Sequence, residues 1–396
     1  MVKIFNVDNG KRKRRGATPS LARQINIREV LDHLRHKSPL SRAELTRMSG
    51  VSAPTMQKLL TVLLDSGLIR EVESEVEGRG RPSKSYTLSG RKIQVFGAVV
   101  GVTTCKIFTA PLSLELRKIA EYKFPTPDSY DELIGEFRQF MLKQASQNIS
   151  FLGLGISIPG LVNTIEQNVI VSPNIHYLDG SSPATDMAEG LDLQTLTLQE
   201  QLALCLAEQN AGSTDDCNNF VVIDLSNGMG MGIMNNGGQL NGKCGYAGEL
   251  GHIVVAPGGP LCGCGKHGCL ESVASDFVLQ RKVSEKVGYE VSFTELEKML
   301  RNGSIDVSKE LDEILDYLGR GISMTINILN PGLVLLNGRI FEMIPEAIDI
   351  AREKTAKYAM APGFKECMIK RTKGNRDAGV LMGISNLLVD SISEIE

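Results

Sequence analysis

The chain has 396 residues, enough for two or three domains, and its 42% hydrophobic and 22% charged residues are typical of a globular protein. No apolar run reaches the roughly 18 residues of a membrane span and the N-terminus lacks a signal-peptide core, so we expect a cytoplasmic protein without a membrane partner. Residues 1–90 hold 17 Lys and Arg against 9 Asp and Glu, whereas the rest hold 26 against 37, which predicts that only the basic head meets nucleic acid.

The first predicted elements are a basic arm and a helix. Residues 11–15 are five consecutive Lys and Arg, which form either an arm that touches phosphates or a solvated tail. From Leu21 to Lys37 apolar residues recur at the helical period. The members of this apolar stripe are Ile27, Val30, Leu31 and Leu34.

A helix-turn-helix follows the first helix. Ser41 and Glu44 match a capping box, which opens a helix that ends near Met48. A turn at Gly50 leads to Ser52, which is expected to cap the second helix. The expected DNA-facing positions are Ser52, Ala53, Thr55, Gln57 and Lys58. The expected inward stripe is Met56, Leu59, Leu60 and Leu63.

A wing completes the predicted head. Residues 68–72 and 84–88 can pair as strands, and residues 78–82 between them read Gly-Arg-Gly-Arg-Pro. Such a short cationic segment suits a narrow minor groove, so Arg79 and Arg81 are expected to contact DNA. Small three-helix units also serve as protein-docking modules, but charge, wing and arm together favour DNA binding.

After about residue 94 the pattern changes to strands separated by helices. Strand-like runs cover residues 95–102, 105–110, 152–160 and 169–174, and residues 130–147 have a helical pattern. Mixed hairpins with helical crossovers, repeated twice, predict two α/β lobes around a cleft.

A candidate metal site lies in the second half of the chain. His252, Cys262, Cys264 and Cys269 supply one imidazole and three thiols, the donor set of a closed structural zinc site. Neighbouring glycines allow the backbone to fold tightly enough to bring the sulfurs together. The alternatives are buried free cysteines in a Gly-rich loop or a disulfide pair, which the expected cytoplasmic setting disfavours.

The same block carries a family resemblance. Residues 248–252, Gly-Glu-Leu-Gly-His, and residues 262–271, Cys-Gly-Cys-Gly-Lys-His-Gly-Cys-Leu-Glu, closely resemble the signature of the ROK family of bacterial sugar kinases and sugar-responsive repressors. Residues 41–45 and 80–82 match sequences of its repressors. The resemblance covers nearly the whole chain and implies an actin-like, hexokinase-type ATPase fold after the winged helix-turn-helix, with a zinc knuckle.

The resemblance and the patterns together suggest a domain division. We expect a basic arm at residues 1–20 and the DNA-binding head at 21–90. The first α/β lobe is expected at 91–212, the second lobe with the zinc site at 213–376, and a C-terminal helix that returns to the first lobe at 377–396.

The resemblance also implies a sugar site. His252 would bind zinc through one ring nitrogen while the other helps to hold a sugar hydroxyl, and Glu249 and Glu271 would accept hydrogen bonds from neighbouring hydroxyls. Gln199 and Glu200 align with the family's Asn-Asp pair, whose Asp is the general base of the kinases. Asn174 is a further candidate.

The nucleotide side departs from the kinase pattern. Residues 99–103 read Val-Val-Gly-Val-Thr where kinases carry Asp-x-Gly-Gly-Thr, so the acid that organises the metal-nucleotide is missing. The second phosphate loop, at residues 226–232, keeps three glycines but has Asn227 in place of a hydroxyl. Kinases also carry a glycine run after the strand that precedes the adenosine pocket, and residues 335–339 retain one of its glycines. These changes indicate a former kinase.

The resulting prediction is a sugar-responsive DNA-binding transcriptional regulator of carbohydrate metabolism genes, most often a repressor in this family. Its partners would be operator DNA and a small sugar or sugar derivative, its cofactor structural zinc, and its assembly a homodimer or homotetramer. One alternative is an ATP-dependent sugar kinase that also binds DNA, since Glu200 retains a carboxylate. Another is a constitutive DNA-binding protein whose lobes only dimerise.

Overall fold

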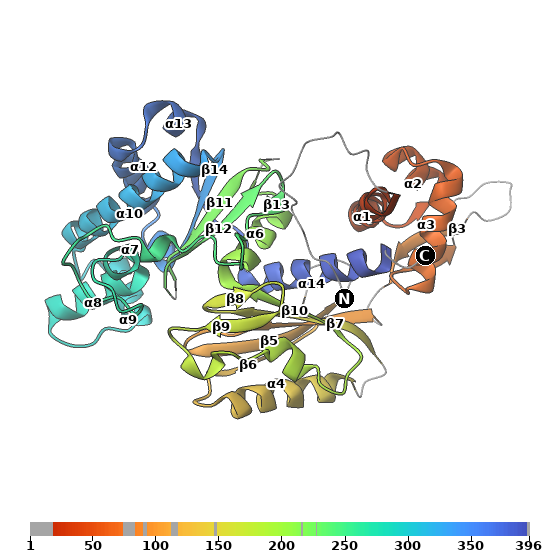
Figure 1. Ribbon diagram of the computed structural model, residues 1–396, viewed down its shortest axis with the longest axis horizontal. Helices are drawn as coiled ribbons and strands as arrows, with labels where there is room; N and C mark the ends of the chain where they lie inside the picture. Colours follow the sequence, from red (N-terminus) through yellow and green to blue (C-terminus); the bar gives the residue numbers. More distant parts are fainter. Residues whose placement is uncertain are drawn as a thin grey trace.

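The head, first lobe and second lobe follow one another along the computed structural model of the chain (Figure 1). The structure describes residues 19–73, 84–89, 93–111, 118–145, 149–214, 217–226 and 228–393. Residues 1–18 of the predicted arm, residues 78–82 of the predicted wing with Arg79 and Arg81, and Asn227 lie outside these residues. Within them, no helix is long and apolar enough to cross a membrane.

The head is a winged helix-turn-helix. Its helices are α1 (Pro19–Lys37), α2 (Arg42–Ser49) and α3 (Ala53–Asp65), and its strands are β1 (Leu40–Ser41), β2 (Ile69–Glu73) and β3 (Lys84–Leu88). The predicted capping box is present: Ser41 N donates to Glu44 Oε2 over 2.8 Å, and Ser41 Oγ accepts from Glu44 N. Gly50 ends α2 with φ 66°, which a residue with a side chain rarely adopts.

The sheet of the head has one strand more than the sequence indicates. β2 and β3 pair antiparallel as expected, and β1 adds to β3 on the other side. A two-residue strand carries no periodicity, so the pattern along the chain could not reveal it.

The first lobe has a five-stranded sheet in the order β10-β7-β4-β5-β6. These strands are β4 (Ile93–Val99), β5 (Thr104–Pro111), β6 (Ala120–Pro125), β7 (Ser150–Ile158) and β10 (Gln194–Gln199). Strands β4, β7 and β10 are parallel, and β5 and β6 form antiparallel pairs beside β4. Side chains alternate across the sheet: Phe96 joins the core under α4 (Tyr130–Ala145), and Val95 joins the core under the helices of the other face.

Shorter elements connect the strands of the first lobe at its cleft side. They are β8 (Leu161–Asn163), β9 (Asn168–Val171), the 3₁₀ turn η1 (His176–Leu178) and α5 (Pro183–Met187).

Two helices cover the second face of this sheet, α6 (Glu200–Ala211) and α14 (Arg376–Ser393). Glycine permits their close approach. A Cβ at Gly379 would lie 1.6 Å from the carbonyl oxygen of Ala203 on α6, and one at Gly155 would lie 2.9 Å from Val380 Cγ1 on α14. The C-terminal helix therefore lies directly against α6 and the first sheet.

The second lobe repeats the layered plan. Its sheet has the order β13-β12-β11-β14-β15, with strands β11 (Phe220–Asp224), β12 (Gly230–Asn235), β13 (Gly238–Gln239), β14 (Leu333–Asn337) and β15 (Met368–Arg371). α6 covers one face. Seven helices of the described chain contribute side chains to the large apolar core on the other face. They are α7 (Leu270–Ala274), α8 (Asp276–Val287), α9 (Phe293–Arg301), α10 (Ser308–Leu329), α11 (Arg339–Met343), α12 (Ala347–Tyr358) and α13 (Ala361–Glu366), preceded by the 3₁₀ turn η2 (Leu250–His252).

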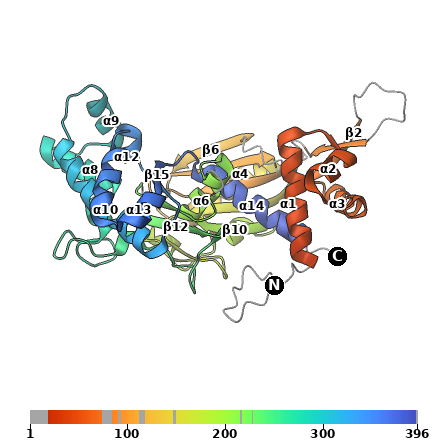
Figure 2. The ribbon, with the colours of Figure 1, turned by 90° about the horizontal axis from the view of Figure 1, so that it is seen from above.

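One continuous apolar core joins the head to the first lobe. Ile27 and Leu34 of α1 share a cluster with Ile384 and Leu388 of α14 and with Val95 of β4. Figure 2 shows α14 extending from the region between the two lobes to α1. The head is therefore anchored on α14.

Candidate functional sites

The candidate metal centre is built by a Gly-rich loop between η2 and α7. His252 ends η2, and Cys269 is the residue before α7. Gly268 has φ 75°, and a Cβ there would lie 1.7 Å from the carbonyl oxygen of Ala256, so only glycine fits. The N–H of Cys262 donates to the carbonyl of Lys266 over 2.8 Å, which closes the tight turn that carries Cys264.

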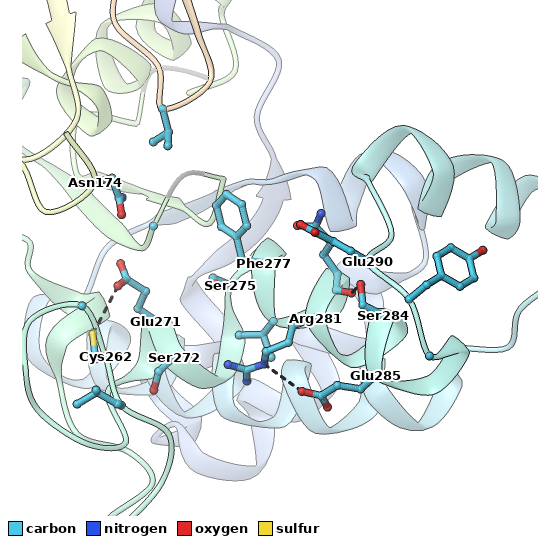
Figure 3. Close-up of a pocket in the computed structure, with 18 residues that line it drawn as sticks. Asn174, Cys262, Glu271, Ser272, Ser275, Phe277, Arg281, Ser284, Glu285 and Glu290 are labelled. Carbon is cyan, nitrogen blue, oxygen red and sulfur yellow. Dashed lines mark hydrogen bonds and ion pairs between the residues drawn. The ribbon is translucent and has the colours of Figure 1, made fainter. Parts of the chain in front are cut away.

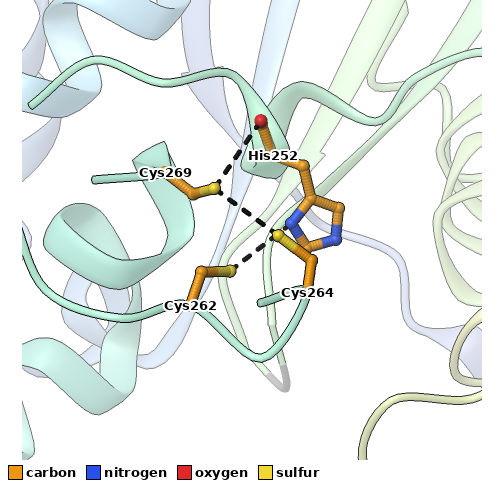
Figure 4. Close-up of side chains that lie close together, drawn as sticks. All are labelled: His252, Cys262, Cys264 and Cys269. Atoms are coloured by element: carbon orange, nitrogen blue, oxygen red, sulfur yellow. Dashed lines mark hydrogen bonds between the residues drawn. The ribbon is translucent and has the colours of Figure 1, made fainter. Parts of the chain in front are cut away.

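The four predicted ligands converge on one point (Figure 4). Their donor atoms all lie within 4.8 Å of one another. Sγ of Cys264 and Cys269 are 3.6 Å apart, as are Sγ of Cys262 and Nδ1 of His252. Two thiolates bound tetrahedrally at about 2.3 Å lie about 3.8 Å apart, so the donor set could hold a metal ion of the size of zinc. All of these cysteines are free thiols, and no disulfide forms.

His252 presents its second nitrogen to the other side. Nε2 lies 3.7 Å from Oε2 of Glu249, while Nδ1 faces the thiols. Burial raises the pKa of Glu249. This geometry suits the two roles expected of His252, since a metal on Nδ1 leaves Nε2 to hydrogen-bond with a ligand or with Glu249.

Glu271 links this centre to the loop after β11. Its Oε2 accepts from the N–H of Met229 over 2.7 Å, and its Oε1 lies 3.5 Å from Sγ of Cys262. A Cβ at Gly228 would lie 2.9 Å from Oε2. The glycine therefore lets the loop reach the carboxylate, which is held from both sides.

A cavity of about 900 Å³ opens beside Glu271 (Figure 3). Asn174 and Glu271 face each other at one end, close to Gly228, and α8 lines the other end. The described residues that line this cavity do not include four of the predicted sugar ligands. These are Gln199, Glu200, Glu249 and His252.

Gln199 and Glu200 lie at the start of α6 and have other partners. Gln199 Nε2 donates to the carbonyl of Gly160 over 3.4 Å. Glu200 is buried, and its Oε1 lies 2.8 Å from Nη1 of Arg376. A role in sugar binding for these two residues stays a prediction, and for Glu200 it would require rearrangement of this ion pair.

Arg376 was not singled out by the sequence, and it joins the two lobes. Besides Glu200, its guanidinium donates to Asp224 Oδ2 over 2.5 Å and to Ser226 Oγ over 2.8 Å. Burial alone would raise the pKa of Asp224, but Arg376, with Asn337 and Ser226, lowers it below the usual value. The sequence feature that could have pointed to Arg376 is its position directly before the Asp-Ala-Gly at the start of the last helix.

Asp276 is a second buried acid that the sequence did not reveal. Its carboxylate accepts from the N–H groups of Arg339 over 2.6 Å and Ile340 over 3.1 Å, which are the first backbone donors of α11. Burial raises the pKa of Asp276 to about 7, although these hydrogen bonds oppose the shift. The backbone donors that follow β14 are therefore already satisfied by the protein itself.

The predicted DNA-facing residues share the exposed face of α3. All five are exposed, namely Ser52, Ala53, Thr55, Gln57 and Lys58. The four residues of the inward stripe are all buried, namely Met56, Leu59, Leu60 and Leu63. Arg42 Nη1 donates to Gln57 Oε1 over 2.5 Å, which fixes α2 against the exposed face of α3.

Fold and site define a protein with a winged DNA-binding head on a hexokinase-type body. Residues 95–391 match the ROK family and residues 29–80 match the MarR family. Because the first match covers most of the chain, the protein belongs to the ROK family.

Two similar proteins are regulators. The Xylose repressor of Bacillus subtilis is 24% identical over 94% of this chain and 97% of its own length. The DNA-binding transcriptional dual regulator NagC of Escherichia coli is 26% identical over 81% of this chain and 82% of its own.

The Glucokinase of Thermotoga maritima is 26% identical and covers 76% of this chain and 99% of its own. Among solved structures, a ROK family transcriptional regulator described as a homolog of the E. coli MLC protein superposes with a TM-score of 0.80 at 24% identity, covering 94% of this chain and 98% of its own. That likeness shows the same fold.

Proposed function

We propose that the protein is a cytoplasmic, sugar-responsive DNA-binding regulator of carbohydrate metabolism genes, and specifically a repressor. The observation that carries the proposal is the exposed polar face of α3 on a head anchored to α14, whose first residue, Arg376, pairs with Asp224 of the second lobe. Similarity to the Xylose repressor extends over head and body alike, whereas the match to a Glucokinase covers 76% of the chain.

The proposed sugar contacts gather at the end of the cleft next to the metal centre. Glu271 and Asn174 face the cavity directly. Glu249 and His252 belong to the metal centre and do not line the cavity, and Nε2 of His252 is the nitrogen that remains available when Nδ1 binds a metal. Carboxylates form stronger hydrogen bonds to hydroxyls than neutral acceptors do, so this group suits a sugar.

The proposed cofactor is structural zinc on His252, Cys262, Cys264 and Cys269. When bound, it would crosslink η2, the Gly-rich loop and the start of α7. Glu271 follows Cys269 by two residues, so the same crosslink would fix Glu271 at the mouth of the cavity.

The proposal holds that the protein is not an enzyme. Arg376 forms ion pairs with both Glu200, at the position of the kinase base, and Asp224. Asp276 takes the backbone donors at the start of α11. A nucleotide phosphate approaching these groups would meet satisfied donors and a buried carboxylate.

A homodimer or homotetramer is part of the proposal, because one winged head reads few base pairs and a two-fold protein reads symmetric half-sites.

DNA from upstream of the protein's own gene offers a direct test of DNA binding. We expect the full chain to bind it at least tenfold tighter than random DNA of equal length at the same salt concentration. Equal affinity for both would contradict the proposal.

The alternative sugar kinase makes a different prediction. If the full chain phosphorylates a hexose with ATP, and Glu200→Ala abolishes this activity, the protein is a sugar kinase. That result would contradict the proposal that it is not an enzyme. We expect no hexose phosphate above the background of a protein-free reaction.

A further inference from the structure

The cavity beside Glu271 extends well beyond the proposed sugar contacts. Its volume is about 900 Å³, near the top of the ~300–1,000 Å³ range of pockets that enclose drug-sized ligands. The cavity therefore has room for a ligand much larger than one hexose. Figure 3 shows the ring of Phe277 between Asn174 and Glu271 on one side and Glu290 on the other. The space past Phe277 is therefore a second compartment of the same cleft.

One face of α8 forms the wall of this second compartment. Phe277, Arg281 and Ser284 recur at helical spacing and line the cavity. On the opposite face, Leu279 and Val283 are fully buried in the core of the second lobe. Because this core holds the helix, its cavity-lining side chains project from a rigid support.

Phe277 supplies a flat apolar surface in this wall. Its side chain is 41% exposed. The ring packs edge-on against Phe293, with centroids 5.4 Å apart and planes at 67°, and the guanidinium of Arg339 lies 4.1 Å from the Phe293 centroid. Packing against Phe293 therefore holds the Phe277 ring, and its exposed part lines the cavity, where the C–H surface of a pyranose can stack on an aromatic ring.

The charges of the cavity disfavour an anionic ligand. Its lining includes Glu271, Glu285 and Glu290, and the cation among its lining residues, Arg281, has Nε 3.8 Å from Oε1 of Glu285. Acidic walls repel phosphate but accept hydrogen bonds from hydroxyls. A neutral polyhydroxylated group suits this compartment better than a sugar phosphate or a nucleotide does.

We infer that the effector is a neutral oligosaccharide, with one ring at Glu271 and Asn174 and the next ring on Phe277. The inference rests on the proposed function, since both concern ligands of the same cleft. It adds that the protein senses a chain of at least two sugars and not the free monosaccharide.

Calorimetry on the full chain tests this with matched probes: glucose against cellobiose and maltose, N-acetylglucosamine against its β-1,4 dimer, xylose against xylobiose, and glucose 6-phosphate. We expect one dimer to bind at least tenfold tighter than its monomer, and glucose 6-phosphate to bind no tighter than glucose. Monomers that bind as tightly as every dimer would overturn the inference and leave the proposed function intact. If none of the sugars binds, both fail.

Variants locate the second ring. Phe277→Leu keeps an apolar side chain without the flat face, so the monomer-to-dimer ratio of Kd values should fall toward one, and Phe277→Tyr should restore it. The control is Tyr122→Ala, which removes a 39% exposed aromatic side chain from β6, outside the cavity. An unchanged ratio in Phe277→Leu, with wild-type thermal stability, would overturn the inference.

Discussion

Arg376 shows how one residue sets the properties of the cleft. Its guanidinium pairs with Glu200 on α6 and with Asp224 on β11, and the side chains of both acids are less than one tenth exposed. Buried charges are tolerated when each has a partner, so the acids and Arg376 depend on one another. The side chain thereby ties the first turn of α14 to the second lobe.

Replacement of Arg376 by Met should strongly destabilise the protein. It removes the cation that pairs with two buried carboxylates, and loss of one partner from a buried ion pair costs about 3–5 kcal/mol of unfolding free energy. Chemical denaturation measures the loss. Arg301→Met, which removes an exposed ion pair with Glu297 on α9, should cost about 0.3–0.5 kcal/mol. Equal losses in the two variants would contradict the account of Arg376.

A partial rescue separates charge from shape. Adding Glu200→Gln and Asp224→Asn to Arg376→Met removes both buried negative charges, so part of the lost stability should return. No recovery would mean that Arg376 acts through packing.

Asp276 predicts a pH dependence of stability. Its pKa is about 7 in the folded protein and 3.8 for an unperturbed Asp, so between these values the folded state holds a proton that the unfolded state lacks. Stability contributed by this group is therefore complete below about pH 4 and falls by up to ~1.4 kcal/mol per pH unit toward pH 7.

Asp276→Asn should remove this component of the slope. The matched control Asp65→Asn, at an exposed residue of α3, should keep the wild-type slope. Denaturation midpoints at several pH values between 4 and 8 provide the measurement. If the unfolding free energy changes with pH equally in wild type and Asp276→Asn, the Asp276 carboxyl is ionised over the whole range from pH 4 to 8, which would contradict this prediction.

The metal ligands make a separate prediction. Cys264→Ser should lower the zinc content measured by elemental analysis and weaken the response of DNA binding to sugar, because the proposed zinc would lose a ligand in the loop that leads to Glu271. Cys244→Ser, at an exposed cysteine outside the cluster, should change neither. Full zinc content in Cys264→Ser would remove the ligand assignment.

Among the elements, those with local signals were predictable. Ser41 and Glu44 lie three residues apart and form the capping box that their spacing indicates. The proposed metal ligands also lie within one short segment, so glycine and cysteine spacing is informative. The structure brings together what these local patterns suggest.

Elements held by distant partners were not predictable. Arg376 and Asp224 are 152 positions apart, and no periodicity connects them. The glycines of β7 read as part of an apolar run, yet Gly155 is required because α14 crosses there. Such features arise from packing between segments, which the order of residues does not display.

Helix α3 carries a prediction about DNA. Lys58→Ala should weaken binding and reduce the slope of log affinity against log salt by about one, because a phosphate contact is lost. Lys365→Ala, at an exposed position of α13, should leave affinity and slope unchanged. The same slope in Lys58→Ala and wild type would show that this face of α3 does not contact the backbone of DNA.

At the scale of the whole molecule, α14 lies between the two proposed binding sites. Its first residue is paired with both lobes, and Ile384 and Leu388 share a core with α1. A ligand that favours one arrangement of the lobes would therefore act on the helix that supports the head. In the proposed division into arm, head, two lobes and returning helix, α14 is the returning helix, and it connects the lobes to the head.

Sugar in the cleft is proposed to change the affinity of the head for DNA. The direct test is fluorescence anisotropy of DNA from upstream of the protein's own gene, titrated with protein at fixed salt, without and with each sugar probe. We predict that one sugar shifts the Kd for DNA by about 5–150-fold, and that Glu271→Gln reduces this shift. A sugar that binds by calorimetry but leaves the DNA titration unchanged would contradict the account.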